Sequence, residues 1–127
     1  MGNAALVAPE LRQHEALITA LENSGIRIAI AMWAHLPEYE SWRFVLASKD
    51  LDKFDLRDAY LKIREALDNA GITVWETPTL HIMKTTDPFI RAMRKTFKNL
   101  PTHSGIRVGG YTWAGRYIDD GYAYKIA

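Results

Sequence analysis

The chain of 127 residues contains no cysteine, which excludes disulfide bonds, thiol chemistry and any metal site built on thiolates. This absence fits a reducing compartment, and we expect a cytoplasmic protein. Long hydrophobic runs are absent as well. The longest, Ile28 to Ala34, is far shorter than the roughly 20 residues that cross a bilayer. Met1 to Leu6 lack the basic and apolar regions of a secretory signal, so we expect neither export nor a membrane partner.

An excess of charge of one sign is also missing. Sixteen Lys and Arg residues stand against 15 Asp and Glu, and a net charge of +1 gives no overall field that favours nucleic acid or membrane. Hydrophobic residues make up 48% and charged residues 24% of the chain, which excludes global disorder. No repeat, linker or low-complexity tract divides the sequence. It therefore predicts a single domain over residues 1–127.

Local signals predict three helices. The first spans Pro9 to Asn23 and carries an apolar stripe at helical spacing. The second follows Asp55, which can cap it, and ends at Gly71. The third has the strongest signal, because Asp87-Pro88 combines an N-cap with proline at the first helical position. We expect it to run to about Asn99 and to stop before the next proline.

Five segments favour strands. Ile26 to His35 is a nearly continuous apolar run, typical of a central strand covered on both faces. Ile72 to Thr77 stays ambiguous, because Pro78 argues against a continuous strand. The order α-β-β-α-β-α-β-β indicates an α+β fold: a mixed, largely antiparallel five-stranded sheet with three helices mainly on one face. The other strand candidates are Ser41 to Ser48, Thr79 to Thr85, Ile106 to Trp113 and Arg116 to Ile126, the last two forming a hairpin.

Four stretches carry a resemblance: Trp42 to Ser48, Ala59 to Ile63, Asp87 to Arg91, and Ile118 to Asp120 with Tyr122 to Tyr124. Together they resemble a family of small bacterial proteins of unassigned function. The matching residues are packing and capping residues. The resemblance therefore implies a bacterial, cytoplasmic domain and assigns no catalytic residue.

Motifs for phosphate or metal chemistry are missing. There is no P-loop and no G-x-G-x-x-G between a strand and a helix, and the glycine-rich Gly105 to Gly110 leads into a strand. The acidic run Asp50 to Asp55 lacks the glycine at the sixth position and has Leu61 where a calcium loop needs Glu, so we interpret it as a loop ending in a helix cap. The four histidines are too scattered for a ligand set. We expect neither a metal site nor a cofactor.

His14 falls among the apolar residues of the first helix. A partly buried histidine making one or two hydrogen bonds explains this, and a site or interface over that helix is the alternative. The stripe consists of Leu11, Leu17, Ile18 and Leu21.

Asp120 shares the period-two face of Tyr122 and Tyr124 in the last strand. A bulge at Gly121 would rotate this carboxylate out of the core, and we expect that outcome. The alternative is a buried carboxylate with a raised pKa, a candidate general base or metal ligand.

The third helix is chemically one-sided. Four cations fall within an arc of about 100°, opposite an apolar face, and no Asp or Glu occurs between Pro88 and Ile118. A solvated amphipathic helix explains this pattern, and a docking face for phosphate or an acidic protein is the alternative. The candidate binding residues are Arg91, Arg94, Lys95 and Lys98 on the helix, with Arg107 and Arg116 beyond it.

Two functions remain compatible with these patterns. The first is a non-enzymatic interaction or accessory module that contacts nucleic acid or an acidic protein through the basic helix face. The second is a small nuclease-like enzyme, in which Asp120 with His81 or His103 acts on a phosphodiester. Only the anion clamp of such an enzyme is visible in the sequence, so we favour the module. Leu61, on the polar side of the second helix, is a minor hint of self-association.

Overall fold

The computed structural model describes residues 8–98 and 105–127 of the chain. Helices and strands follow one another in the order expected from the sequence, and two single 3₁₀ turns join them. The helices are α1 (Ala8–Asn23), α2 (Leu56–Asn69) and α3 (Pro88–Phe97), and the 3₁₀ turns are η2 (Pro37–Tyr39) and η3 (Val74–Glu76). The strands are β1 (Ile30–Leu36), β2 (Ser41–Ala47), β3 (Leu80–Met83), β4 (Ile106–Arg107), β5 (Tyr111–Trp113), β6 (Arg116–Ile118) and β7 (Asp120–Ile126).

Five strands form one mixed sheet in the order β3-β2-β1-β7-β4. β1 pairs antiparallel with β2 and β7, β4 pairs antiparallel with β7, and only β2 and β3 run parallel. The predicted mixed, largely antiparallel five-stranded sheet is therefore confirmed. β1 lies at its centre, as its continuous apolar sequence indicated.

The two C-terminal strand segments are each broken in two. The first breaks between β4 and β5, where a Cβ on Gly109 would lie 2.7 Å from the Cα of Asp120. The second breaks at Asp119, whose backbone N–H donates to the carbonyl of His35 at 3.1 Å. β5 and β6 leave the main sheet as a separate two-stranded ribbon, which turns at Ala114-Gly115 with φ of 52° and 84°.

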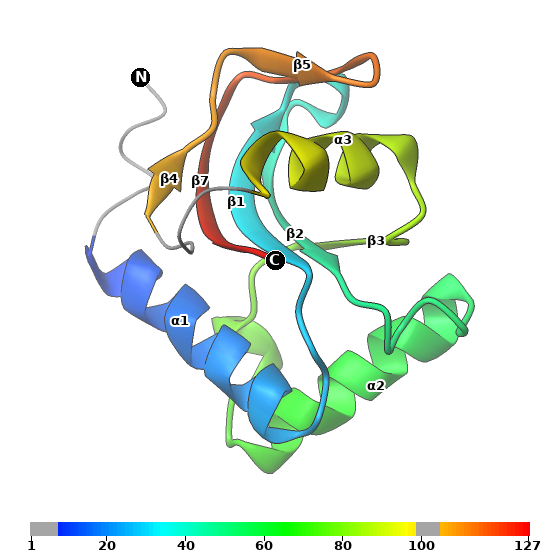
Figure 1. The fold of residues 1–127 in the computed structure, drawn as a ribbon. Coiled ribbons are helices and arrows are strands. Elements are labelled where there is room, and N and C mark those ends of the chain that lie inside the picture. Colours follow the sequence, from blue (N-terminus) through cyan, green and yellow to red (C-terminus); the bar gives the residue numbers. More distant parts are fainter. Residues whose placement is uncertain (1–7, 99–104) are drawn as a thin grey trace.

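Helices cover both faces of the sheet (Figure 1). Alternate side chains of a strand point to opposite faces, so each central strand contributes to two cores. Phe44 and Leu46 of β2 pack with α1 and α2, whereas Val45 packs with α3 on the other face. Two of the three helices thus share one face, and α3 alone covers the other.

The predicted caps are confirmed. Asp55 accepts a hydrogen bond from the backbone N–H of Asp58 at 2.8 Å and starts α2. Asp87 accepts from the N–H of Phe89 at 2.9 Å, with Pro88 at the first helical position of α3. The predicted end of α3 near Asn99 lies outside the described residues, as does the side chain of Leu11.

Within residues 8–98 and 105–127, no helix has the length and apolar character needed to span a bilayer.

Candidate functional site

The cations of α3 lie on its outer face. Phe89, Ile90 and Met93 are buried against the sheet, which turns the opposite side of the helix to solvent. Arg91 and Lys95 are exposed there, and the exposed Lys98 follows at the C-cap. The one-sided pattern in the sequence therefore produces a cationic surface.

Arg94 differs from its neighbours on this face. Its side chain is half-buried, and its Nε donates a hydrogen bond of 2.7 Å to the backbone carbonyl of Ala127. The guanidinium thus holds the end of β7 against α3. Among the described residues, no carboxylate forms an ion pair with Arg91, Lys95 or Lys98. We call these three residues the α3 cation row.

Arg107 and Arg116 do not extend the α3 cation row, because each is paired with a carboxylate. Arg107 Nη2 donates to both carboxylate oxygens of Asp120, at 2.8 and 3.0 Å. Arg116 Nη1 lies 2.6 Å from Glu38 Oε1, and its guanidinium sits 5.4 Å from the ring centre of Phe89. Arg107 thus joins β4 to β7, and Arg116 joins β6 to η2.

The expectation that a bulge at Gly121 turns the Asp120 carboxylate out of the core is wrong. The strand break falls at Asp119 rather than at Gly121, and it does not turn the Asp120 carboxylate fully to solvent. The side chain is 23% exposed, binds Arg107, and also accepts from the N–H of Gly121 at 2.8 Å. Gly121 is buried, and a Cβ at this position would lie 2.9 Å from Val108, so the site has no room for a side chain. Asp120 is a half-buried carboxylate held by an arginine.

Asp120 and His81 are not brought together. His81 lies on β3 and Asp120 on β7, three strand spacings or about 14 Å apart across the sheet. They also point to opposite faces, because His81 pairs with Val45 whereas Asp120 shares a face with Tyr124. No described histidine hydrogen bonds with Asp120, and His103 lies outside the described residues.

His81 instead borders a cationic corner beside η2. Its ring centre is 5.2 Å from that of Tyr39, over which the Arg43 guanidinium lies at 4.2 Å. Burial, and then the charges of Arg116 and Arg43, lower the pKa of His81. The imidazole is therefore neutral at physiological pH.

His14 is buried inside an aromatic cluster, 3% exposed. Its Nδ1 shares a hydrogen bond of 2.6 Å with the hydroxyl of Tyr124, and its ring centre lies 4.8 Å from Trp33 and 5.0 Å from Phe44. Burial lowers the pKa of His14 from 6.5 to about 4. The interpretation as a buried, hydrogen-bonded histidine is confirmed.

Trp33 links this aromatic cluster to Trp42 of the neighbouring strand β2. It stacks on Trp42 at 5.7 Å, and its Nε1 is buried with no hydrogen-bond partner in the part of the chain that the structure describes. His35, on the same face of β1, has its Nδ1 3.3 Å from Asp119 Oδ2, outside hydrogen-bonding alignment. Sequence reasoning did not connect these residues, because they meet only through the pairing of β1 with β2 and β7.

The acidic run of residues 50–55 serves the fold. Asp50 binds Arg27 through its backbone N–H and guanidinium at 2.8 to 3.1 Å, which lowers the pKa of Asp50 to about 2. Asp52 accepts from the backbone N–H and the hydroxyl of Thr85. Asp55 caps α2, and no group of three possible metal ligands occurs in the described part of the chain. The interpretation as a loop ending in a cap is confirmed.

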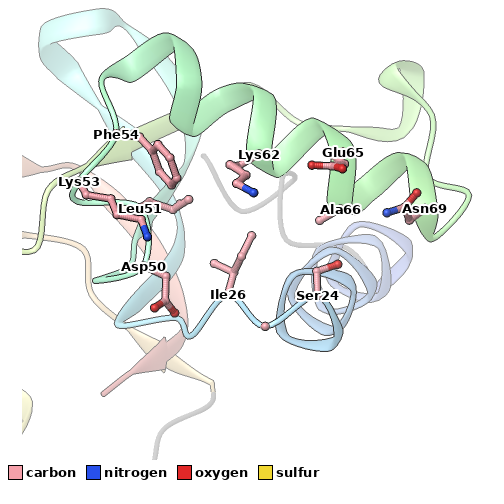
Figure 2. A pocket seen from close by; sticks show the side chains of 11 residues that line it. Ser24, Ile26, Asp50, Leu51, Lys53, Phe54, Lys62, Glu65, Ala66 and Asn69 are labelled. Carbon is pink, nitrogen blue, oxygen red and sulfur yellow. The ribbon is translucent and has the colours of Figure 1, made fainter.

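A cavity of about 500 Å³ opens beside this loop (Figure 2). Its wall mixes the charged groups of Lys53, Lys62 and Glu65 with the apolar Ile26 and Phe54. Asp50 also lies at its rim, where Arg27 already engages the carboxylate. Nothing in the wall concentrates one charge or one reactive group.

An exposed tyrosine that sequence reasoning missed stands near the C-terminal turn of α3. Trp113 Nε1 donates to Thr96 Oγ1 at 3.2 Å, and the Trp113 ring lies 6.0 Å from Phe97. These contacts fix the β5–β6 ribbon to α3. Tyr111, 60% exposed, has its ring centre 5.6 Å from that of Trp113. In the sequence, the spacing of two between Tyr111 and Trp113 could have indicated that both side chains lie on one face of a strand.

Comparison of the chain with protein-family models, with curated proteins and with solved structures finds no match. The resemblance to small bacterial proteins therefore stays a prediction.

Proposed function

We propose that this chain is a non-enzymatic module that binds nucleic acid through the α3 cation row. One observation carries the proposal: Arg91, Lys95 and Lys98 are exposed on one side of a helix whose other side is locked into the core. Carboxylates within the described residues neutralise none of them.

Helix stability does not account for the α3 cation row. Glu or Gln would form the outer side of α3 equally well. The helix dipole favours cations near the C-terminus, which suits Lys95 and Lys98 but not Arg91 in the first turn. The row spans about 10 Å along the axis, a length that meets several phosphates of one strand at 3.4 Å of rise each.

Tyr111 favours single-stranded nucleic acid as the ligand. Proteins that bind single strands combine cations for the backbone with exposed aromatic rings on which bases stack. Tyr111 is exposed and is carried by a ribbon that Trp113 fixes to the last turn of α3. A duplex would engage only the cations, since its bases are already stacked.

Fluorescence anisotropy with labelled single strands and duplexes at several salt concentrations tests the proposal. Three phosphate contacts predict a slope of log K against log salt of about −2 on single strands and about −3 on duplex DNA. Changing Arg91, Lys95 and Lys98 together to Gln should weaken binding at least tenfold and flatten the slope. The fold should survive, because these sites are exposed.

A matched control removes the same charge elsewhere. Lys49, Lys53 and Lys62 are exposed on the β2–α2 loop and α2. Their triple Gln variant should bind nearly as well as wild type. Absence of binding at low salt, or equal loss in both variants, would contradict the proposal, and an acidic protein partner would become the alternative to test.

The nuclease-like alternative gains no support from the geometry. It needs an acid, a base and an anion clamp close together. Asp120 is bound by Arg107, and His81 lies on the opposite face of the sheet from it. We therefore keep the non-enzymatic module as the proposal.

A further inference from the structure

β3 is an edge strand with an open side. It pairs with β2 only, and in a parallel ladder alternate residues direct their N–H and C=O groups to opposite sides. Thr79 accepts from the N–H of Phe44 at 2.7 Å and so faces β2. Leu80 and Ile82 consequently direct their backbone groups away from the sheet. Within the described residues, nothing pairs with that side of the strand.

Of the usual protections of an open edge, this four-residue strand has only its short length. Natural edges carry Lys, Pro or bulges that block pairing with another chain. Leu80–Met83 has none of these. Lys84 follows directly, but its Nζ donates to the carbonyl oxygens of Asp52 and Phe54 in the β2–α2 loop.

An apolar groove runs beside the open edge, between β3 and α2. Its volume is about 520 Å³, and Leu80 and Ile82 form its floor. Its wall is formed by residues of α2: Arg57 and the apolar Leu56, Tyr60 and Leu61, which are 68%, 41% and 49% exposed. Single exposed leucines are common on protein surfaces, but three large apolar side chains around one groove indicate an interaction surface.

The connection from α2 to β3 enlarges this surface. Arg64 binds the carbonyl of Ile72 and the hydroxyl of Thr77, which holds the segment against α2. η3 in this segment presents Val74 and Trp75, 61% and 95% exposed. Together with Leu56, Tyr60 and Leu61 of the groove, they give five large apolar side chains that are 41% to 95% exposed.

We infer that a second copy of this chain occupies the open edge, through antiparallel pairing of β3 with the partner's β3 about a twofold axis. Leu80 of each copy then exchanges both backbone hydrogen bonds with Ile82 of the other, and the two His81 residues face each other across the axis. Two five-stranded sheets join into one of ten strands.

A second copy fits this edge better than an unrelated peptide does. A twofold axis perpendicular to the sheet places both α2 helices on the same face, side by side across the axis. The groove of one copy therefore adjoins the groove of the other across the axis. A single extended peptide would pair with the edge but would leave the leucines of α2 largely exposed.

The absence of native cysteine allows a direct test of this register. In His81→Cys the only two thiols of the dimer would face each other in a non-hydrogen-bonded pair, with Cβ atoms about 5 Å apart, and a small shift closes a disulfide. Mild oxidation should yield a covalent dimer on a non-reducing gel, and reductant should reverse it. Thr79→Cys is the matched control. Its two thiols would lie two residues to either side of the axis, and it should cross-link far less.

Sedimentation of the full chain gives the second measurement. Wild type should sediment as a dimer at micromolar concentrations, and the exposed-site double variant Leu56→Glu with Leu61→Glu should sediment as a folded monomer of 14.5 kDa. A monomeric wild type overturns the inference. So does a dimer in which His81→Cys cross-links no better than Thr79→Cys, or one that survives the double variant. The triple Gln variant of the α3 cation row should stay dimeric, so failure of nucleic-acid binding and failure of dimerisation are distinguishable.

Discussion

His14 and Tyr124, 110 residues apart in the chain, share a buried hydrogen bond of 2.6 Å that ties α1 to β7. The imidazole sits among the rings of Trp33, Phe44 and Tyr124, and this apolar surrounding disfavours its protonated form. A polar group in the core is tolerated here because its Nδ1 has a partner.

The buried imidazole makes stability depend on pH in a defined window. The pKa of His14 is about 4 in the folded chain and near 6.5 when unfolded, so the unfolded state binds the extra proton. The free energy of unfolding is therefore unaffected by this titration above pH 6.5 and decreases as the pH falls toward 4. The loss amounts to roughly 3 kcal/mol, at about 1.4 kcal/mol per pKa unit.

Urea denaturation at stepped pH values measures this loss. His14→Phe should flatten the profile between pH 6.5 and 4, whatever its effect at neutral pH. His81→Gln is the necessary comparison, because the pKa of His81 is also lowered and it contributes with the same sign. An unchanged profile in His14→Phe would show that His14 is not protonated on unfolding in this range.

Asp120→Asn should cost less than about 1 kcal/mol, because Arg107 is 52% exposed and exposed ion pairs contribute little. The amide oxygen can still accept from the N–H of Gly121. Asp120→Ala removes that acceptor and should cost more, about 1–2 kcal/mol. Chemical denaturation compares the two variants. A loss above about 2 kcal/mol in Asp120→Asn would indicate a role for the charge beyond the Arg107 pair.

Gly109→Ala should destabilise the chain by about 1–3 kcal/mol, because the new Cβ would overlap the backbone of the neighbouring strand. The contacts would be 2.7 Å to the Cα of Asp120 and 3.0 Å to the carbonyl oxygen of Asp119. Thermal denaturation measures the effect, with the exposed Thr112→Ala on β5 as the control. Equal melting temperatures would show that β4 and β7 separate at little cost.

Tyr111→Ala should weaken binding of single strands about tenfold and leave duplex binding unchanged, since base stacking on an aromatic ring contributes about 1–3 kcal/mol. Tyr117→Ala is the matched control. Tyr117 is 47% exposed but pairs with Thr112, and therefore lies on the opposite face of the ribbon from Tyr111 and Trp113. Anisotropy with both ligands distinguishes the variants, and an equal effect in the two would contradict stacking at Tyr111.

Local signals in the sequence sufficed for much of the fold. The caps at Asp55 and Asp87 were predictable because each depends on residues within three positions of the cap. The place of β1 at the sheet centre was predictable because both of its faces are apolar. Some strand boundaries were not predictable. Residues Ile26 to Ala29 were expected to belong to the first strand, but β1 begins at Ile30.

The candidate site was only partly predictable. Helical periodicity placed Arg91, Lys95 and Lys98 on an outer face, because the apolar residues opposite them must be buried. Periodicity carries no information on partners from distant segments. Arg94 therefore looked equivalent to them, although it binds the carbonyl of Ala127.

The sequence by itself determined the element order, the caps that begin α2 and α3 and which side of each helix faces water, because these follow from contacts between near neighbours in the chain. Tertiary structure alone decided the strand order, the open edge at β3 and the placing of α3 opposite α1 and α2. It also decided that Arg107 meets Asp120 and that His14 meets Tyr124. Such pairs depend on how the strands align across the sheet, which is fixed by the packing of both cores together and not by any local pattern.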